Sequence, residues 1–417
     1  MSWGGTLTKL FCGIDWAEHH HDIAIVDDTG IRVAKARISN DAAGLRALLE
    51  LLASVGDHSS DPIPVAIEKP HGLLVACLRA TGRQVFAINP YAVSRYRDRH
   101  GVARKKSDEQ DALILANILR TDMAAHRPLP ADTDLARAIT VLARAQQDAV
   151  WDRIQLGQRI RSLLHDYFAA ALQAFAHLPN GGLTKAEARL ILALAPTPAQ
   201  AAALTRGQLR AALKRAGRAR YLDRDVERLH TIFHAEHMRL PEVIEQAMGH
   251  QLTALLSQLE ATCTAEQNLA SCVAETFAQH PDAEIITSFP GVGSLVGARI
   301  LAEIGDDRTR FADARGLKAY AGSAPVTRAS GKSRQIMTRK VKNDRLAAAG
   351  YIWAFAALRP SPGARAHYDR RKEADDAHTA ALRHLFNRLI GCLHHCLKTR
   401  RTYDESIAFP PQAAAVA

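Results

Sequence analysis

Short apolar runs alternate with polar turns along the N-terminal part of the chain, and helical spacing of apolar residues dominates the rest. The short runs predict strands because they are brief, rich in β-branched residues and bounded by turn residues. The predicted strands lie at residues 10–14, 22–26, 31–38, 64–67 and 84–88. Apolar residues at helical spacing predict helices at 42–53 and 72–80, before and after the fourth strand. The N-terminal part is therefore expected to form a mixed α/β domain.

Helical periodicity continues from Asp108 toward the C-terminus. Residues 135–175 carry apolar side chains at helical spacing with only Gly157 as a break, which predicts a long, coiled-coil-like amphipathic helix or a helical hairpin. A second long helical stretch is expected at about 223–279. We therefore expect three domains. Their ranges are 1–125 for the α/β domain, 126–280 for a helical linker or oligomerisation region, and 281–417 for a mainly helical C-terminal domain.

The composition narrows the class of protein. Of the 417 residues, 47% are hydrophobic and 23% are charged, so the chain can bury more than one core and is not disordered. The net charge of +11 favours a polyanion such as nucleic acid as the partner. Six scattered cysteines favour a reducing compartment over a disulfide framework. The N-terminus lacks the apolar core of a signal peptide, and the apolar run at 346–358 is too short to span a bilayer, so we expect a cytoplasmic protein.

Cys392 and Cys396 bracket His394 and His395 near the end of the chain. Their spacing matches no common zinc-binding pattern. The surrounding residues have the periodicity of an apolar helix, so we interpret this segment as helical and not as a metal site.

Four carboxylates are candidates for a metal site. Asp15 ends the first predicted strand and Glu68 the fourth, while Asp108 and Asp111 lie three residues apart at the start of a predicted helix. Strand ends and helix starts of an α/β domain commonly meet at one edge of the sheet. Carboxylate oxygens suit Mg²⁺, and two ions would offset four negative charges and could promote phosphodiester chemistry. Taken singly, the same residues could be helix caps or solvated acids at strand ends.

A strip of basic residues precedes that predicted helix, with Tyr91 and Tyr96 interleaved. The basic residues are Arg95, Arg97, Arg99, Arg104, Lys105 and Lys106. Such a strip suits contacts to nucleic-acid phosphates together with stacking on bases or sugars. Many charge runs are only solvated surfaces, but this one adjoins the candidate metal site.

A Pro-Gly-x-Gly turn at 289–293 precedes a predicted helix at 295–304. This pattern is typical of a helix-hairpin-helix element, in which backbone N–H groups near Gly291 and Gly293 would hold a DNA phosphate. An ordinary glycine-rich turn would give the same pattern. No Gly-Lys-Ser/Thr follows, which excludes a nucleotide P-loop.

Ser330 precedes Gly331 within the densest basic cluster of the chain. The basic residues of this cluster are Arg328, Lys332, Arg334, Arg339, Lys340 and Lys342. Their cations predict a phosphate-binding loop. A serine hydroxyl is a poor nucleophile until a base, a metal or a cationic setting activates it, so the residues alone favour phosphate binding over nucleophilic attack by Ser330.

Together, these motifs resemble those of the insertion-sequence one-ten transposases, also called bridge-RNA-guided recombinases. The matching segments are Gly13–Asp15, Ala66–Glu68, Lys106–Ala112, Pro290–Gly293, Gly322–Pro325 and Ser330–Gly331. That family has an RNase H/RuvC-like domain with a DEDD tetrad and a C-terminal domain with a catalytic serine. The predicted order of three strands, helix, strand, helix and strand is also that of an RNase H-like fold.

The resemblance implies specific roles. Asp15, Glu68, Asp108 and Asp111 would bind Mg²⁺, and Ser330 would attack a DNA phosphate to form a phosphoserine link. An RNA encoded by the mobile element would pair with target and donor DNA, so base pairing would carry the sequence specificity. The central helices would hold a homodimer or a homotetramer together.

Two other functions remain open from the residues. One is a RuvC-like, Mg²⁺-dependent, structure-specific endonuclease in which Ser330 only anchors phosphate. The other is a non-catalytic nucleic-acid-binding protein with a decayed acidic site. A covalent protein–DNA adduct separates the recombinase from the nuclease, and Mg²⁺-dependent strand cleavage separates both from the non-catalytic protein.

Overall fold

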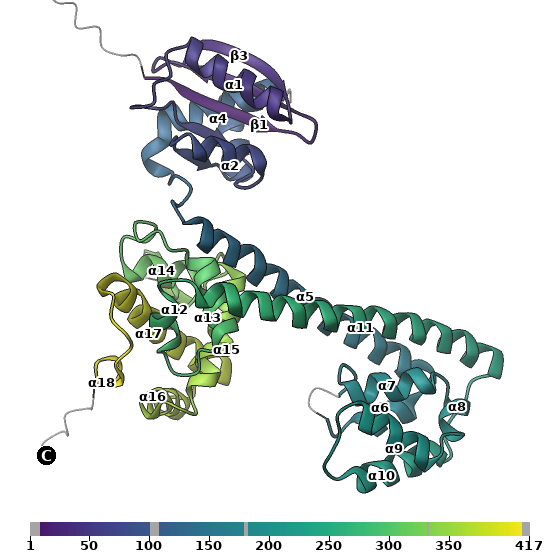
Figure 1. The fold of residues 1–417 in the computed structure, drawn as a ribbon. Helices are drawn as coiled ribbons and strands as arrows, with labels where there is room; N and C mark the ends of the chain where they lie inside the picture. The colour runs from purple at the N-terminus through teal and green to yellow at the C-terminus, as the bar shows by residue number, and fades with distance from the viewer. Residues whose placement is uncertain (1–8, 101–107, 179–181, 332, 411–417) are drawn as a thin grey trace, which may run out of the picture. The chain divides into compact units, whose positions relative to one another are not determined.

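The computed structural model describes residues 9–100, 108–178, 182–331 and 333–410, without the side chains of His100 and Asp108 (Figure 1). The chain divides into two compact units, residues 1–131 and residues 132–417. The first unit is mixed α/β and the second is mainly helical, which confirms the fold class expected at this level. The predicted division near residue 280 stays a prediction.

The first unit contains a five-stranded sheet in the order β3-β2-β1-β4-β5. The strands are β1 (Phe11–Trp16), β2 (His20–Val26), β3 (Arg32–Ser39), β4 (Val65–Ile67) and β5 (Val85–Ala87). The first three strands form an antiparallel meander, whereas β4 and β5 run parallel to β1. All five lie where the apolar runs predict them, because short runs of β-branched residues determine strands locally.

Helices cover both faces of this sheet (Figure 1). Ile14 and Ile67 pack against α1 (Ala42–Ser54) and α2 (Leu73–Ala80) on one face. Phe11 and Ala66 pack on the other face, against α3 (Pro90–His100) and α4 (Asp108–Asp122). A short 3-10 turn (Met123–Ala125) follows α4. Because side chains alternate along a strand, every second residue of β1 faces α4.

Gly13 sets the distance between β1 and α4. A Cβ atom at this position would overlap the carbonyl oxygen of Ala112 and the backbone nitrogen of Ala116. Replacing Gly13 with alanine is therefore expected to push α4 away from the sheet and to lower the free energy of unfolding by about 3 kcal/mol. Chemical denaturation measures this loss. Gly207→Ala in α9 is the control and should not destabilise the protein, because an added Cβ would make only an ordinary van der Waals contact with Oγ1 of Thr205 at 3.8 Å.

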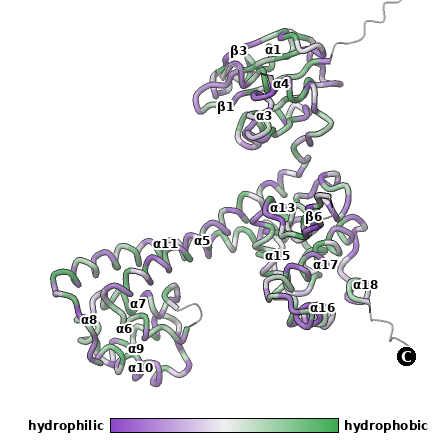
Figure 2. Tube along the Cα trace, turned by 180° about the vertical axis from the view of Figure 1, so that it is seen from behind, coloured by the Kyte–Doolittle hydropathy of each residue, from purple (hydrophilic) through white to green (hydrophobic). Residues whose placement is uncertain are grey.

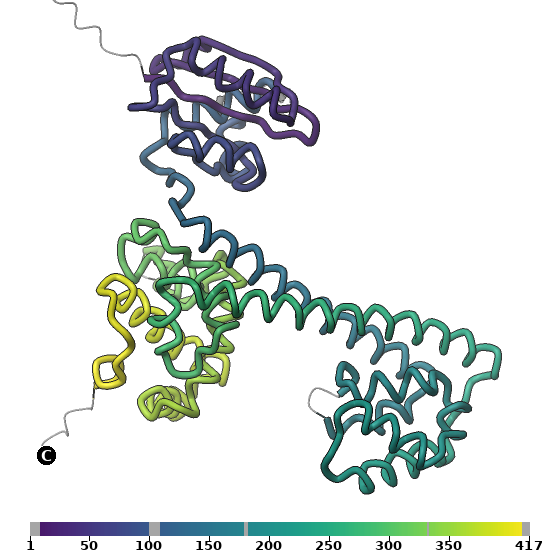
Figure 3. The backbone as a smooth tube through the Cα atoms, in the orientation of Figure 1, coloured from purple at the N-terminus to yellow at the C-terminus, as the bar shows by residue number. Residues whose placement is uncertain are grey.

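Two long antiparallel helices, α5 (Asp134–Tyr167) and α11 (Glu242–Ala278), lie side by side in the second unit (Figures 1 and 3). Ile139 of α5 and Val273 of α11 share one hydrophobic core, whereas Ile160 and Leu252 share another. Hydrophilic and hydrophobic stretches follow one another along both helices (Figure 2), as apolar residues at spacings of three and four produce in an amphipathic helix.

Each of the two long helical stretches that the sequence predicts is divided into two helices in the structure. The stretch from 223 to 279 is divided into α10 (Leu222–His234) and α11, because Pro241 cannot lie inside a helix and instead precedes α11. The stretch from 135 to 175 is divided at Phe168, between α5 and α6 (Ala169–Phe175).

Short helices complete the core that the C-terminal half of α5 shares with the N-terminal half of α11. They are α6, α7 (Ala186–Leu194), α8 (Pro198–Ala202), α9 (Arg206–Arg215) and α10. Thr197 and Thr205 each form a capping box with the glutamine three residues later, which fixes where α8 and α9 begin.

The C-terminal helices pack around the fully buried Trp353. These elements are α12 (Ala283–Thr287), α13 (Ser294–Ile304), α14 (Ala314–Tyr320), α15 (Asp344–Ala357), α16 (Pro362–Glu373), α17 (His378–Thr399) and α18 (Glu405–Ala408). A β-hairpin, β6 (Val326–Ser330) and β7 (Ser333–Met337), lies between α14 and α15. Across the described residues, no helix combines the length and the apolar character needed to cross a membrane.

Candidate functional site

Asp15 and Glu68 lie side by side at the C-terminal ends of adjacent parallel strands. β1 and β4 pair with Ile14 opposite Ile67, so the next residue of each chain segment is one of the two carboxylates. Since Ile14 and Ile67 face α1 and α2, the alternation of the strands directs Asp15 and Glu68 to the face covered by α4. Both side chains are half-buried.

The N-terminal end of α4 lies at the same edge of the sheet. Ala112 packs on Gly13, two residues before Asp15, whereas Arg120 near the other end of α4 donates a hydrogen bond to the carbonyl oxygen of Asp28 at 3.3 Å. Asp111, next to Ala112, is 7% exposed. The sheet edge therefore brings Asp15, Glu68 and the first turn of α4 into one region, as the sequence pattern predicts.

Asp108 begins α4, but its side chain lies outside the described residues. Among the side chains that the structure does describe, no group of three or more His, Cys, Asp or Glu residues converges as metal ligands. Convergence of all four carboxylates therefore stays a prediction.

Asp111 forms an ion pair with Arg97 of α3. Arg97 was expected to contact phosphate, and in the structure its guanidinium instead pairs with one of the four candidate carboxylates. A cation at this position offsets the repulsion between neighbouring carboxylates and favours their ionised form. The pairing links the basic strip directly to the acidic site.

The rest of the basic strip is only partly described. Arg95 and Arg99 are exposed on α3, where they are accessible to a polyanion. The predicted contacts Arg104, Lys105 and Lys106 lie outside the described residues.

Asp22 is a neighbour of Asp15 that the sequence patterns did not single out. Asp22 is the direct partner of Asp15 in the β1–β2 ladder, and Arg37 of β3 donates two hydrogen bonds to its carboxylate at 3.0 and 2.8 Å. This arrangement buries Asp22, which is 7% exposed, with its charge already paired. The hairpin register of the first two strands is the signal that could have placed Asp22 beside Asp15.

Ser330 lies at the tip of the β6–β7 hairpin, in a ladder whose side chains are almost all exposed. It pairs with Ser333 across a turn that begins at Gly331. Gly331 has a φ of 55°, a left-handed conformation that favours glycine, and Lys332 lies outside the described residues. Within the described part of the chain, the structure records no hydrogen bond from the Ser330 hydroxyl.

The hairpin separates the cations around Ser330 onto two faces. Ser330 and Arg328 are two residues apart on β6, so their side chains share one face of the hairpin. Their cross-strand partners on β7, Ser333 and Gln335, lie on the same face. Arg334 pairs with Ala329, so its side chain belongs to the other face. Of these two arginines of the expected basic cluster, only Arg328 therefore lies on the face of Ser330.

The basic segment after the hairpin is anchored at its end. Lys340 is exposed and Arg339 is half-buried, whereas Lys342 forms an ion pair with Asp344 at 2.9 Å. The aliphatic part of Lys342 also covers Gly322, where any Cβ would meet it.

A buried network of hydrogen bonds fixes the start of α15, which follows this basic segment in the chain. Glu303 is 2% exposed and accepts two hydrogen bonds from Arg144 at 2.8 Å and one from Asn343 at 2.6 Å. The hydrogen bonds with Glu303 raise the pKa of Arg144 above its ordinary value. Asn343 also caps α15 by accepting a hydrogen bond from the N–H of Leu346 at 2.8 Å. Only the cap has a local sequence signal, because Arg144 and Glu303 come from distant helices.

The Pro-Gly-x-Gly turn combines a packed glycine with an open one. A Cβ at Gly291, which has a φ of 76°, would lie 2.6 Å from the backbone of Ala356 and Ala357, so this glycine permits close packing on α15. Gly293 precedes α13, is exposed and has no atom near its Cβ position. The N-terminal N–H groups of α13 therefore lie at an accessible surface.

Comparison with known proteins identifies relatives along the whole chain. A family model described as Transposase, for the DEDD group of IS110, matches residues 12–169. A second model, described as Transposase IS116/IS110/IS902 family, matches residues 283–369. A Streptomyces coelicolor protein named as a transposase for the IS117 mini-circle is 63% identical over 99% of this chain and 100% of its own length. An uncharacterized 42 kDa protein of insertion element IS900 from Mycobacterium paratuberculosis is 29% identical over 94% of this chain and 97% of its own length.

Proposed function

Because the chain belongs to the IS110 family of transposases, we propose that it cuts and rejoins DNA through a covalent link between Ser330 and a DNA phosphate. The observation that carries this proposal is the hairpin geometry. Ser330 is exposed at the tip of a two-residue turn, with Arg328 on the same face to hold the phosphate that it attacks. A DNA strand can approach this tip because no other side chain covers it among the described residues.

The chemistry at Ser330 conserves the energy of the phosphodiester. The serine Oγ forms a bond to phosphorus while the bond from phosphorus to the deoxyribose oxygen breaks, and the hydroxyl proton ends on the leaving DNA hydroxyl. A second DNA hydroxyl then reverses the same steps and releases the serine. Arg328 stabilises the charge of the five-coordinate phosphorus. Rejoining needs no external energy source, as a recombinase requires.

The carboxylates at the sheet edge are proposed to hold Mg²⁺. Asp15, Glu68 and Asp111 supply hard oxygen ligands on one face of the sheet, and Asp108 begins the same turn as Asp111. Bound Mg²⁺ would supply positive charge to polarise a phosphate and its attacking or leaving oxygen. The sheet order β3-β2-β1-β4-β5, with two parallel strands after an antiparallel meander, supports an RNase H/RuvC-like assignment.

The remaining family properties are proposed for this chain as well. Arg95 and Arg99 and the net charge of +11 suit DNA and an element-encoded guide RNA. The α12–α13 turn is proposed as a helix-hairpin-helix-like phosphate contact. Exposed apolar residues on α5, including Val141 at 69% and Ile154 at 49%, suit contacts in a dimer or tetramer.

Arg328 and Arg334 form a matched pair that tests this arrangement. They carry the same charge on the same exposed hairpin and differ in the face from which they project. Arg328→Gln is expected to lower the yield of covalent protein–DNA adduct on a labelled DNA substrate by at least ~10-fold, because it removes the cation beside the attacked phosphate. Denaturing electrophoresis of the labelled DNA with and without protease measures the adduct.

Arg334→Gln is the control and should change adduct formation much less. An equal loss in both variants would show that the hairpin contributes charge without a preferred face. Cleavage without any adduct in the unmodified protein would favour the hydrolytic nuclease, since attack by water leaves no covalent link.

A further inference from the structure

A cavity of about 410 Å³ lies between α14, α17 and the segment that leads to α18. Lys318, Arg388 and Arg401 supply three cations to its wall, and His395 lies beside them. The part of the wall without charge includes Cys392, Tyr403 and Ala408. The segment with Cys392 and His395 is the one that the sequence analysis interpreted as an apolar helix, and no step of the proposed strand transfer uses the residues of this cavity.

Lys318 reaches the cavity because α17 has a glycine where the side chain crosses it. A Cβ at Gly391 would lie 2.6 Å from Cε and 2.9 Å from Nζ of Lys318. The ammonium group therefore lies directly on the helix backbone, with no side chain beneath it. Glycine in the middle of a helix costs stability relative to alanine, so its presence requires a reason such as this close approach.

Arg388 is held in one orientation by two contacts. Its Nε donates a hydrogen bond to the carbonyl oxygen of Ala408 at 2.6 Å, and its guanidinium lies 5.0 Å from the ring centre of Phe409. Among the described residues no hydrogen bond from the terminal nitrogens of this guanidinium is recorded, and these nitrogens can donate to another acceptor. Arg401 follows Arg400, whose left-handed φ of 56° turns the chain at the end of α17.

No carboxylate neutralises these three cations within the part of the chain that the structure describes. Asp404 is the acid of the cavity wall, and its carboxylate accepts hydrogen bonds from the hydroxyl and the N–H of Ser406 at 2.6 and 2.8 Å. The hydrogen bond from the Ser406 side chain, together with the backbone N–H donors of α18, lowers the pKa of Asp404. Asp404 therefore stays ionised as the cap of α18, and three cations against this one carboxylate leave the cavity with net positive charge.

We propose that this cavity binds the phosphate group of a nucleotide or of a nucleic-acid strand. Three cations around one space, one of them a guanidinium held in plane, suit the several oxygens of a phosphate. The uncharged part of the wall leaves room for the sugar attached to it. None of the residues that line this cavity belongs to the β6–β7 hairpin or to the set of carboxylates in the first unit.

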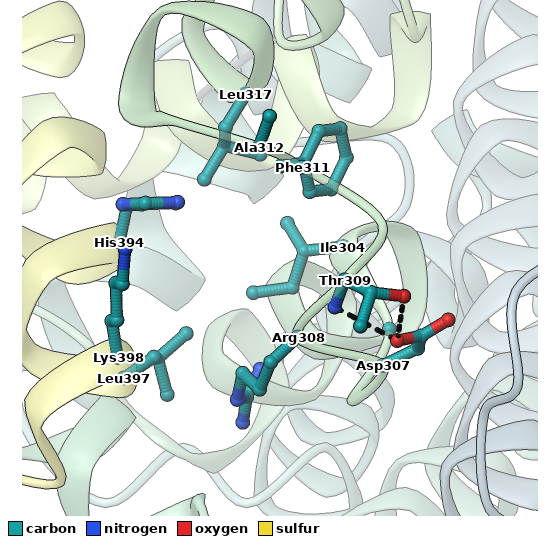
Figure 4. A pocket seen from close by; sticks show the side chains of 11 residues that line it. Ile304, Asp307, Arg308, Thr309, Phe311, Ala312, Leu317, His394, Leu397 and Lys398 are labelled. Carbon is teal, nitrogen blue, oxygen red and sulfur yellow. Dashed lines mark hydrogen bonds between the residues drawn. The ribbon is translucent and has the colours of Figure 1, made fainter.

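A neighbouring cavity on a different face of α17 provides an internal comparison (Figure 4). This cavity, of about 270 Å³, is lined by apolar side chains such as Phe311 and Leu317, with His394 and Lys398 at one side. Its guanidinium, that of Arg308, forms an ion pair with the buried Asp282. Lys398 is therefore an exposed lysine on the same helix that does not belong to the proposed site.

Calorimetric titration with inorganic pyrophosphate on the full-length protein tests the proposal. Gly391→Ala is expected to weaken pyrophosphate binding at least ~10-fold, because the new Cβ displaces the ammonium of Lys318. The same variant should keep its melting temperature, since alanine favours the helix and the displaced atoms are the flexible end of a side chain. Lys318→Gln should weaken binding by a similar factor, whereas Lys398→Gln, the matched control, should leave it unchanged.

Alkylation of cysteines by N-ethylmaleimide provides a second readout. Pyrophosphate should slow the reaction of Cys392, which lines the cavity, and leave that of the exposed Cys272 unchanged. Competition with pyrophosphate by a short single-stranded oligonucleotide would identify a strand phosphate as the ligand. Competition by adenosine monophosphate alone would identify a free nucleotide.

Absence of pyrophosphate binding in the unmodified protein, or unchanged binding in both Gly391→Ala and Lys318→Gln, would overturn the proposal. Strand transfer plays no part in these measurements. Failure of the proposed recombinase function would therefore leave the result at this cavity intact. Absence of phosphate binding at this cavity would likewise leave the proposed recombinase function intact.

Discussion

Replacing Ser330 with alanine is expected to abolish strand exchange and the covalent protein–DNA adduct, with a loss of at least ~10³-fold in rate. The substitution removes the oxygen that forms the proposed phosphoserine bond, while the exposed hairpin loses no packing contact that would cost stability. DNA binding should therefore remain close to that of the unmodified protein. Gel assays of strand exchange, adduct formation and binding on the same DNA measure the three quantities.

Ser333→Ala is the strictest control that the chain offers. Ser333 pairs directly with Ser330 across the turn, so the two hydroxyls share one face of the ladder, the same exposure and the same neighbouring Arg328. If Ser333→Ala lost recombination and Ser330→Ala kept it, the nucleophile would be Ser333, and the assignment to Ser330 would be wrong. Normal recombination in both variants would leave the hydroxyls as phosphate anchors and favour a hydrolytic nuclease.

Glu68→Gln is expected to lower Mg²⁺-dependent DNA cleavage by at least ~10²-fold, the effect of several kcal/mol of lost charge stabilisation. Glutamine keeps the size of the side chain and removes the negative charge beside Asp15, so the sheet should stay folded while metal affinity falls. Cleavage rates measured across a Mg²⁺ titration separate weaker metal binding from unfolding. Higher Mg²⁺ should restore part of the activity.

Glu109→Gln, in the first turn of α4, is the control for this prediction. Glu109 is half-buried, and its carboxylate is already neutralised by ion pairs with Arg32 and Lys35 of β3 at 2.6 and 3.1 Å. Its substitution should change cleavage little. Unchanged Mg²⁺ dependence in Glu68→Gln would remove Glu68 from the metal site, and equal losses in Glu68→Gln and Glu109→Gln would indicate a general effect of charge.

The sequence by itself determined the local elements and much of the candidate chemistry. Strands end next to Asp15 and Glu68 because short runs of β-branched residues form strands whatever lies around them. Asp111 lies in the first turn of a helix for the same reason of local periodicity. Since parallel strand ends meet at one sheet edge, these local patterns were enough to bring the carboxylates into one region.

Only the tertiary structure decided how charged side chains are paired. Arg97 neutralises Asp111, and Lys318 lies on Gly391, because separate helices pack against each other at those points. On the hairpin, a two-residue turn sets the register that places Arg328 on the face of Ser330 and Arg334 on the other. Periodicity reports which face of its own element a residue occupies, whereas the partner across an interface depends on packing between residues far apart in sequence.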